Sequence, residues 1–229
     1  MLRSTRMITL IQIVSLVSYI GSVVFNDHFQ GNLALQILAS ALPTFLLSYE
    51  TYSRSRHVQS NKALLCLYFT SFALFFASIT TILDNLNMKN ETFYSNTAVV
   101  CGYIMAFTRH TNKHSILPVL LLTGFFYWIR MSISSDSWSL TGFISILGYM
   151  VYRSIVRYKS IGKYEYFIAL LGAVTLTAGI TMEVCSAYAN SCLVIQEFNL
   201  KKYREGLLFI GNWVIAIGIN GIKDKTKEG

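Results

Sequence analysis

The sequence predicts an all-α fold: a polytopic transmembrane helix bundle of about eight spans, forming a single integral-membrane domain over residues 1–229. Three observations support this prediction. First, 53% of the residues are hydrophobic and only 13% are charged, whereas a soluble domain carries about 25% charged residues. Second, the apolar residues fall into eight separate stretches. Third, Lys and Arg gather in alternate connections between those stretches. This composition excludes a soluble globular enzyme and a disordered chain.

The length of each apolar stretch predicts a spanning helix. About 20 residues cross a hydrocarbon layer of about 30 Å, because each helical residue rises about 1.5 Å. The first stretch contains no charged residue, is longer than the apolar region of a signal peptide, and is followed by no small-x-small cleavage site, so we interpret it as a retained signal anchor. The expected spans, in order, are residues 7–25, 33–49, 63–83, 93–108, 115–129, 140–152, 166–182 and 206–222.

The last of these stretches differs from the others because it is rich in small and amide side chains. Such a helix makes a poor lipid-facing surface, but it permits close backbone approach to a neighbouring helix. We therefore expect it to pack inside the bundle, with a re-entrant segment as the alternative. The residues concerned are Gly206, Gly211, Asn212, Gly218, Asn220 and Gly221.

The distribution of basic residues predicts the orientation. The N-terminal segment, the even-numbered loops and the C-terminal tail together hold fourteen Lys and Arg residues, against five in the odd-numbered loops. Cytoplasmic loops carry the excess of Lys and Arg, so both termini are expected in the cytoplasm. The same asymmetry accounts for the net charge of +8, and no nucleic-acid partner is implied.

Two features on the predicted outer side are typical of a protein of the secretory pathway. Asn90-Glu91-Thr92 is an N-glycosylation sequon in the third loop. Cys185 and Cys192 both fall in the seventh loop, where they are expected to form a disulfide. Several spans are short, which favours the thinner endoplasmic reticulum membrane or another endomembrane, with the plasma membrane as the alternative.

The sequence offers few candidates for catalysis. His110 and His114 are four residues apart, a spacing that places two side chains on one helical face, and Asp84 and Glu183 lie at outer ends of spans. Interfacial capping and pairing is the favoured interpretation of the two carboxylates. Cys and His spacing does not match a metal site, so no metal and no cofactor are expected.

Polar residues within the spans are mostly hydroxyls and amides, which in membranes usually bind neighbouring helices together. If Gln36 and Asn212 both face inward, they line a polar crevice suited to a lipid headgroup or a small neutral solute. Helix packing is the competing interpretation of the same two residues.

These observations favour a multi-pass endomembrane protein that is non-catalytic. It is expected to handle lipid or a small neutral solute, or to act as an accessory subunit of a membrane complex. Its expected partners are the lipid bilayer and another membrane protein. The alternative hypothesis is an intramembrane lipid-acting hydrolase that uses His110 or His114.

Overall fold

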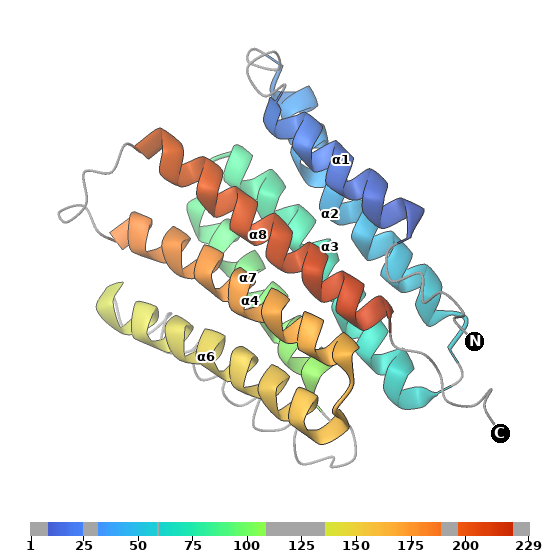
Figure 1. Ribbon diagram of the computed structural model, residues 1–229. Helices are drawn as coiled ribbons and strands as arrows, with labels where there is room; N and C mark the ends of the chain where they lie inside the picture. Colours follow the sequence, from blue (N-terminus) through green and yellow to red (C-terminus); the bar gives the residue numbers. More distant parts are fainter. Residues whose placement is uncertain (1–8, 25–31, 59, 109–135, 189–196, 222–229) are drawn as a thin grey trace.

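The computed structural model describes residues 9–24, 32–58, 60–108, 136–188 and 197–221. These residues form seven helices and no strand, which confirms an all-helical fold for this part of the chain (Figure 1). The helices are α1 (Leu10–Val24), α2 (Leu33–Ser55), α3 (Asn61–Asn85), α4 (Lys89–Phe107), α6 (Asp136–Ile161), α7 (Tyr164–Tyr188) and α8 (Glu197–Asn220).

Three of the helical segments are long and apolar enough to cross a membrane: Leu33–Ser55, Ala63–Asn85 and Tyr164–Met182. Helix α1 is apolar but shorter. The expected span at residues 115–129 lies outside the described residues. The chain is therefore an integral membrane protein by the length and composition of its helices.

Most helices extend beyond the apolar stretches that predicted them. Helix α6 begins at Asp136 and continues to Ile161, although the expected span covered only residues 140–152. Hydropathy marks where the hydrocarbon layer ends, whereas Lys and Arg are good helix formers and do not end a helix. The helix ends instead at Gly162, whose φ of 66° lies in the left-handed region that glycine adopts readily.

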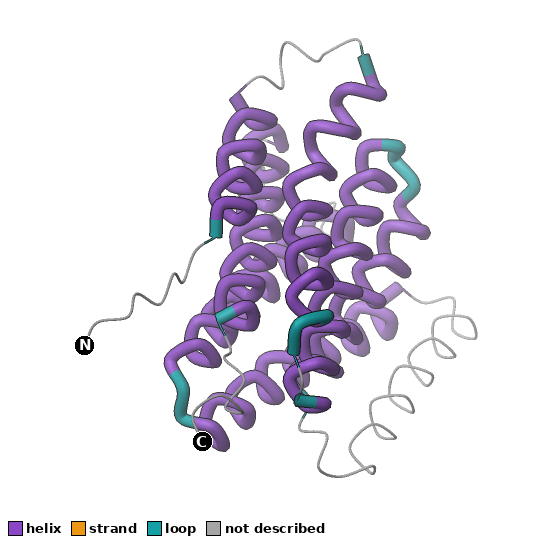
Figure 2. The backbone as a smooth tube through the Cα atoms, turned by 90° about the vertical axis from the view of Figure 1, so that its right-hand side faces the viewer, coloured by secondary structure: helices purple, strands orange, loops and turns teal. Residues whose placement is uncertain are grey.

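The helices run side by side and form a bundle with two distinct ends (Figure 2). At one end, which we call the Glu50 end, Arg54 of α2 donates a hydrogen bond to the carbonyl of Asn220, the last residue of α8. At the other, the Asp84 end, Arg204 near the start of α8 contacts Asp84 near the end of α3. Helices α2 and α8 therefore both end at the Glu50 end and run in the same direction, whereas α3 and α8 run in opposite directions.

Helices α7 and α8 approach each other closely because glycines lie at their contact. A Cβ atom built on Gly211 would lie 2.6 Å from the backbone nitrogen of Leu176. A Cβ on Gly172 would lie 2.6 Å from the nitrogen of Ile215, and one on Gly218 would lie 2.5 Å from the carbonyl oxygen of Glu165. Glycine thus allows backbone to pack against backbone, as expected for small residues between membrane helices.

The outer surface of the bundle is apolar and part of its interior is polar. On α1 the buried side chains are Gln12 and Ser15, whereas apolar residues face outward. This is the reverse of a soluble amphipathic helix, because lipid is the solvent for the outward face. The exposed apolar side chains of α1 are Leu10, Ile13, Val14, Val17, Ile20, Val23 and Val24.

Candidate functional site

A cavity of ≈ 380 Å³ lies within the half of the bundle nearer the Asp84 end. Its walls come from α1, α2, α3, α4, α7 and α8, so it is formed by segments distributed over most of the chain. This volume falls within the range of about 300–1,000 Å³ that is usual for small-molecule sites. The lining is mixed: polar side chains such as Gln36, Asn96 and Asn212 alternate with apolar ones such as Val99, Leu176 and Leu208.

An ion pair connects two walls of the cavity at its charged side. The guanidinium Nη2 of Arg204 donates to Asp84 Oδ2 over 2.6 Å, and both residues line the cavity. Both side chains are partly exposed, at 16% for Arg204 and 32% for Asp84. The pair holds α8 against α3 at this end, and it places one positive and one negative group on the cavity wall.

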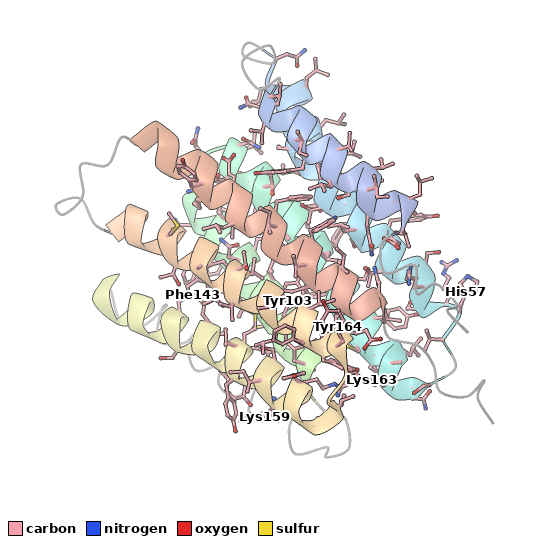
Figure 3. The ribbon with its side chains drawn as sticks, in the orientation of Figure 1. His57, Tyr103, Phe143, Lys159, Lys163 and Tyr164 are labelled. Carbon is pink, nitrogen blue, oxygen red and sulfur yellow. The ribbon has the colours of Figure 1, made fainter. Side chains whose placement is uncertain are left out.

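The inner wall is held by hydrogen bonds between uncharged side chains. Tyr103, which Figure 3 shows among the helices of the bundle, donates from its hydroxyl to Asn212 Oδ1 over 2.5 Å. The amide nitrogen of Asn212 donates in turn to the carbonyl of Leu208 over 2.9 Å. Asn85 bridges α3 to α2 by donating to Ser40 Oγ over 2.8 Å. These contacts fix the positions of the cavity's amide groups.

An aromatic pair forms the wall on the α1 side. Tyr19 and Phe209 stack with ring centroids 4.1 Å apart and an interplanar angle of 11°, and both line the cavity. Val23, one turn further along α1, also lines the cavity and is 37% exposed on the outer surface. At this point the cavity wall and the apolar outer surface share a residue.

Pro43 interrupts the backbone hydrogen bonding of α2 beside the cavity. Proline has no N–H, so the carbonyl of Ala39, four residues earlier in α2, lacks its helical hydrogen-bond partner. Ala39 lines the cavity. Helix α2 continues through Pro43, whose own carbonyl accepts a hydrogen bond of 2.7 Å from Ser15 Oγ of α1. Pro43 thus removes one hydrogen bond within α2, and the contact at its own carbonyl joins α2 to α1.

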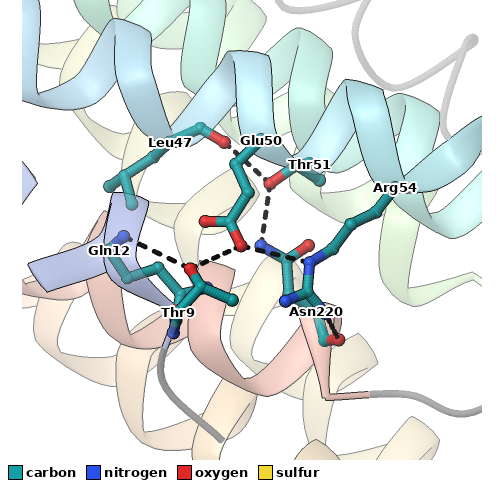
Figure 4. A network of polar contacts seen from close by, with 7 residues as sticks. All are labelled: Thr9, Gln12, Leu47, Glu50, Thr51, Arg54 and Asn220. Atoms are coloured by element: carbon teal, nitrogen blue, oxygen red, sulfur yellow. Dashed lines mark hydrogen bonds and ion pairs between the residues drawn. The ribbon is translucent and has the colours of Figure 1, made fainter. Parts of the chain in front are cut away.

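A second polar cluster lies at the opposite end of the bundle (Figure 4). Glu50 Oε1 accepts hydrogen bonds from Thr9 Oγ1 over 2.6 Å and from Arg54 Nε over 3.1 Å. Arg54 also donates to the carbonyl of Asn220, and Asn220 donates from its amide to Thr51 Oγ1 over 3.2 Å. Helices α1, α2 and α8 are tied together here around a carboxylate that is only 4% exposed.

The start of α1 within this cluster follows a known sequence pattern. Thr9 N donates to Gln12 Oε1 over 3.1 Å, and Gln12 N donates to Thr9 Oγ1 over 3.3 Å. This reciprocal pair is a capping box, in which two unpaired donors at a helix start are satisfied together. Gln12 also accepts from Trp213 Nε1 through its carbonyl over 3.0 Å, which joins α1 to α8.

The structure brings three of the sequence-predicted site residues together. Gln36, Asn212 and Asp84 all line the cavity. Asn90 is exposed and is the second residue of α4, and its glycosylation stays a prediction.

The remaining candidates cannot be placed at a site. His110, His114 and Cys192 lie outside the described residues, as do the side chains of Glu183 and Cys185, so the hydrolase and disulfide hypotheses stay predictions. Among the side chains that the structure describes, no group of three or more His, Cys, Asp and Glu is arranged to hold a metal ion.

Two charged residues make contacts between helices that sequence reasoning missed. Arg204 precedes the expected last span at residues 206–222, but it lies within α8 and pairs with a residue 120 positions earlier. No local sequence pattern signals such a distant partner. Glu50 was expected only at the inner end of a span. Its spacing of four residues from Arg54 was a usable signal, since side chains at i and i+4 are neighbours on a helix.

Comparison of the chain with protein-family models, with curated proteins and with solved structures found no match.

Proposed function

We propose that this chain is a multi-pass protein of internal membranes that binds a lipid or a small neutral solute without transforming it. The observation that supports this function is the cavity nearer the Asp84 end, with Gln36 and Asn212 on its wall. A cavity of this size, mixed in polarity and fixed by side-chain hydrogen bonds, suits a ligand that is itself partly polar. An accessory subunit of a membrane complex could use the same cavity to hold a ligand for that complex.

The uncharged character of the inner wall favours binding over chemistry. Tyr103, Asn212, Asn85 and Ser40 offer hydrogen bonds, and their contacts are mainly with one another and with backbone carbonyls. Such groups orient a ligand, whereas acid–base catalysis requires a titratable group within reach of the reacting atom. Two of the three ionic residues that line the cavity, Asp84 and Arg204, are paired with each other at 2.6 Å, and Glu205 is the third.

The proposal includes eight spans with both termini in the cytoplasm. In this orientation the Glu50 end faces the cytoplasm, and the described basic residues Arg54, Arg56 and Arg157 lie on that side, together with Lys163 and His57 (Figure 3). The cavity then lies in the lumenal half of the bilayer. This placement follows from the excess of Lys and Arg in the alternate loops.

A cavity-filling substitution tests the binding function. Ala39→Phe places an aromatic ring at the cavity wall, whereas Ala34→Phe adds the same ring at an exposed position earlier in the same helix. The full-length protein and both variants are purified in a mild detergent, and the bound small molecules are extracted and identified by mass spectrometry. We expect the wild type and Ala34→Phe to retain a common lipid or solute that Ala39→Phe lacks. Equal retention by all three would exclude the cavity as the binding site.

The orientation is tested through Asn90. A mobility shift of the tagged protein on endoglycosidase treatment, absent in Asn90→Gln, would place the Asp84 end in the lumen. Sensitivity to endoglycosidase H would support residence early in the secretory pathway. Modification of a sequon engineered into residues 56–60, beyond the end of α2, would instead place the Glu50 end in the lumen and reverse the orientation.

A further inference from the structure

The charged residues around the cavity define the kind of ligand that fits it, an inference that rests on the binding function proposed above. Asp84, Arg204 and Glu205 all line the cavity. The cavity lining thus includes two acidic residues and one arginine. A ligand with only a negative charge meets two like charges, and a ligand with only a positive charge meets the arginine. A ligand that carries both charges, with no net charge, meets an opposite charge for each of its ionic groups.

Arg204 retains a donor for an anionic group. Its Nη2 is occupied by Asp84, but its Nε is buried and has no hydrogen-bond partner among the described residues. A buried donor without a partner loses the free energy of its lost hydration, about 1–3 kcal/mol in general, so an acceptor placed there is favourable. Arginine binds phosphate with particular preference because its planar fork matches the phosphate oxygens.

The cavity also offers surroundings suited to the positively charged group of such a ligand. The stacked residues Tyr19 and Phe209 line the same cavity as Glu205. Aromatic faces attract ammonium groups, quaternary ammonium most characteristically, and a carboxylate adds to that attraction. Glu205 directly follows Arg204 in the chain, so the groups suited to a cation and to an anion are adjacent.

The position of the cavity distinguishes a lipid from a soluble solute. Val23 lines the cavity and is also exposed on the apolar outer surface, among the outward-facing residues Ile20 and Val24 of the same helix. Acyl chains attached to a headgroup in the cavity would lie against this surface, which is apolar over the length of α1. A ligand without acyl chains gains nothing from that contact.

From these observations we infer that the cavity binds the headgroup of a zwitterionic phospholipid, with the phosphate at Arg204 and the ammonium group between Glu205 and the Tyr19–Phe209 pair. The acyl chains lie along the outer face of α1. The net neutrality of such a headgroup agrees with a cavity whose remaining polar groups are amides and hydroxyls.

The test uses the delipidated full-length protein in detergent and native mass spectrometry with four probes: dioleoylphosphatidylcholine, dioleoylphosphatidylglycerol, dioleoylglycerol and glycerophosphocholine. We expect phosphatidylcholine to bind about tenfold more tightly than each of the other three, a factor that one well-formed ionic contact supplies. The anionic lipid lacks the ammonium group, the diacylglycerol lacks both ionic groups, and glycerophosphocholine lacks the acyl chains.

Two variants test the assigned contacts separately. Glu205→Gln removes the carboxylate and is expected to abolish the preference for phosphatidylcholine over phosphatidylglycerol. Glu91→Gln makes the same change at an exposed position in the first turn of α4 and serves as the matched control. Arg204→Lys preserves the charge opposite Asp84, and therefore the fold, but removes Nε, and we expect severalfold weaker binding of phosphatidylcholine with an unchanged melting temperature.

The outcomes separate this inference from the proposed function. Binding of phosphatidylglycerol or diacylglycerol equal to that of phosphatidylcholine, if still abolished by Ala39→Phe, would leave the cavity as the binding site and overturn its assignment to a zwitterion. Equal binding of glycerophosphocholine would overturn the assignment to a lipid. If no probe binds in a manner sensitive to Ala39→Phe, the inference fails together with the function on which it rests.

Discussion

Replacement of Gly211 by alanine tests one of the close backbone contacts between α7 and α8. The added Cβ would lie 2.6 Å from the nitrogen and 2.7 Å from the Cα of Leu176 in α7. Ordinary contacts of a Cβ begin near 3.4 Å, so α7 and α8 must separate locally by about 0.8 Å. Neither obstructing atom belongs to a flexible side chain, and the strain cannot be relieved by a rotamer change.

The expected loss of stability follows from two opposing effects. Alanine favours a helix over glycine by about 1 kcal/mol, whereas forcing an extra carbon into a packed contact costs about 1–3 kcal/mol, occasionally more. Backbone obstruction places Gly211→Ala at the upper part of this range, for a net loss of about 2 kcal/mol. In a protein of this size, that loss lowers the melting temperature by about 4–8 °C.

The assay is thermal unfolding of the detergent-purified protein, followed by its monodisperse fraction in size-exclusion chromatography. Gly148→Ala in α6 is the matched control, because a Cβ there has nothing within 4 Å. This control is expected to melt at or slightly above the wild-type temperature. If Gly211→Ala melts within a degree of Gly148→Ala, then α7 and α8 do not pack backbone to backbone, and the reasoning is refuted.

Two further substitutions test the polar contacts. Tyr103→Phe removes the hydroxyl that donates to buried Asn212. The expected loss of folding stability is about 1 kcal/mol, which lowers the melting temperature by about 2–4 °C. An unchanged melting temperature would mean that Asn212 finds another donor. Arg54→Gln leaves the buried carboxylate of Glu50 without its cation. It also removes the hydrogen-bond donor to the last carbonyl of α8. We expect the free energy of unfolding to fall by about 2–3 kcal/mol. Arg56→Gln, an exposed arginine two residues later, should not change the melting temperature, and an equal loss in both variants would show that the cluster contributes nothing specific.

The helical elements were predictable because each depends on a local property. An apolar run of sufficient length identifies a helix regardless of what surrounds it, and α2, α3 and α7 satisfy that criterion in the structure as well. Their true ends were less predictable. Helix α2 continues through Glu50 and Arg54 because these side chains form hydrogen bonds within the bundle, and hydropathy alone treats them as the start of a loop.

The cavity could be anticipated only in outline. Gln36 and Asn212 were singled out because an amide within an apolar stretch needs a partner, and both line the same cavity. The partners themselves are separated by long stretches of sequence: Asn212 is 109 residues from Tyr103, and Arg204 is 120 residues from Asp84. Which helices become neighbours depends on packing, such as the contact at Gly211, and not on any local pattern.

The cluster around Glu50 has a consequence for the order in which the chain assembles during synthesis. Arg54 supplies the positive charge opposite Glu50, Thr9 donates a second hydrogen bond to the same oxygen, and both residues belong to the α1–α2 hairpin. Asn220, the contact contributed by α8, is made 166 residues later than Arg54. The newly made α1–α2 hairpin can therefore enter the bilayer with the carboxylate of Glu50 already paired. The hydrogen bond from Arg54 to the carbonyl of Asn220 forms only after α8 has been made. Closure of this end of the bundle therefore requires α8.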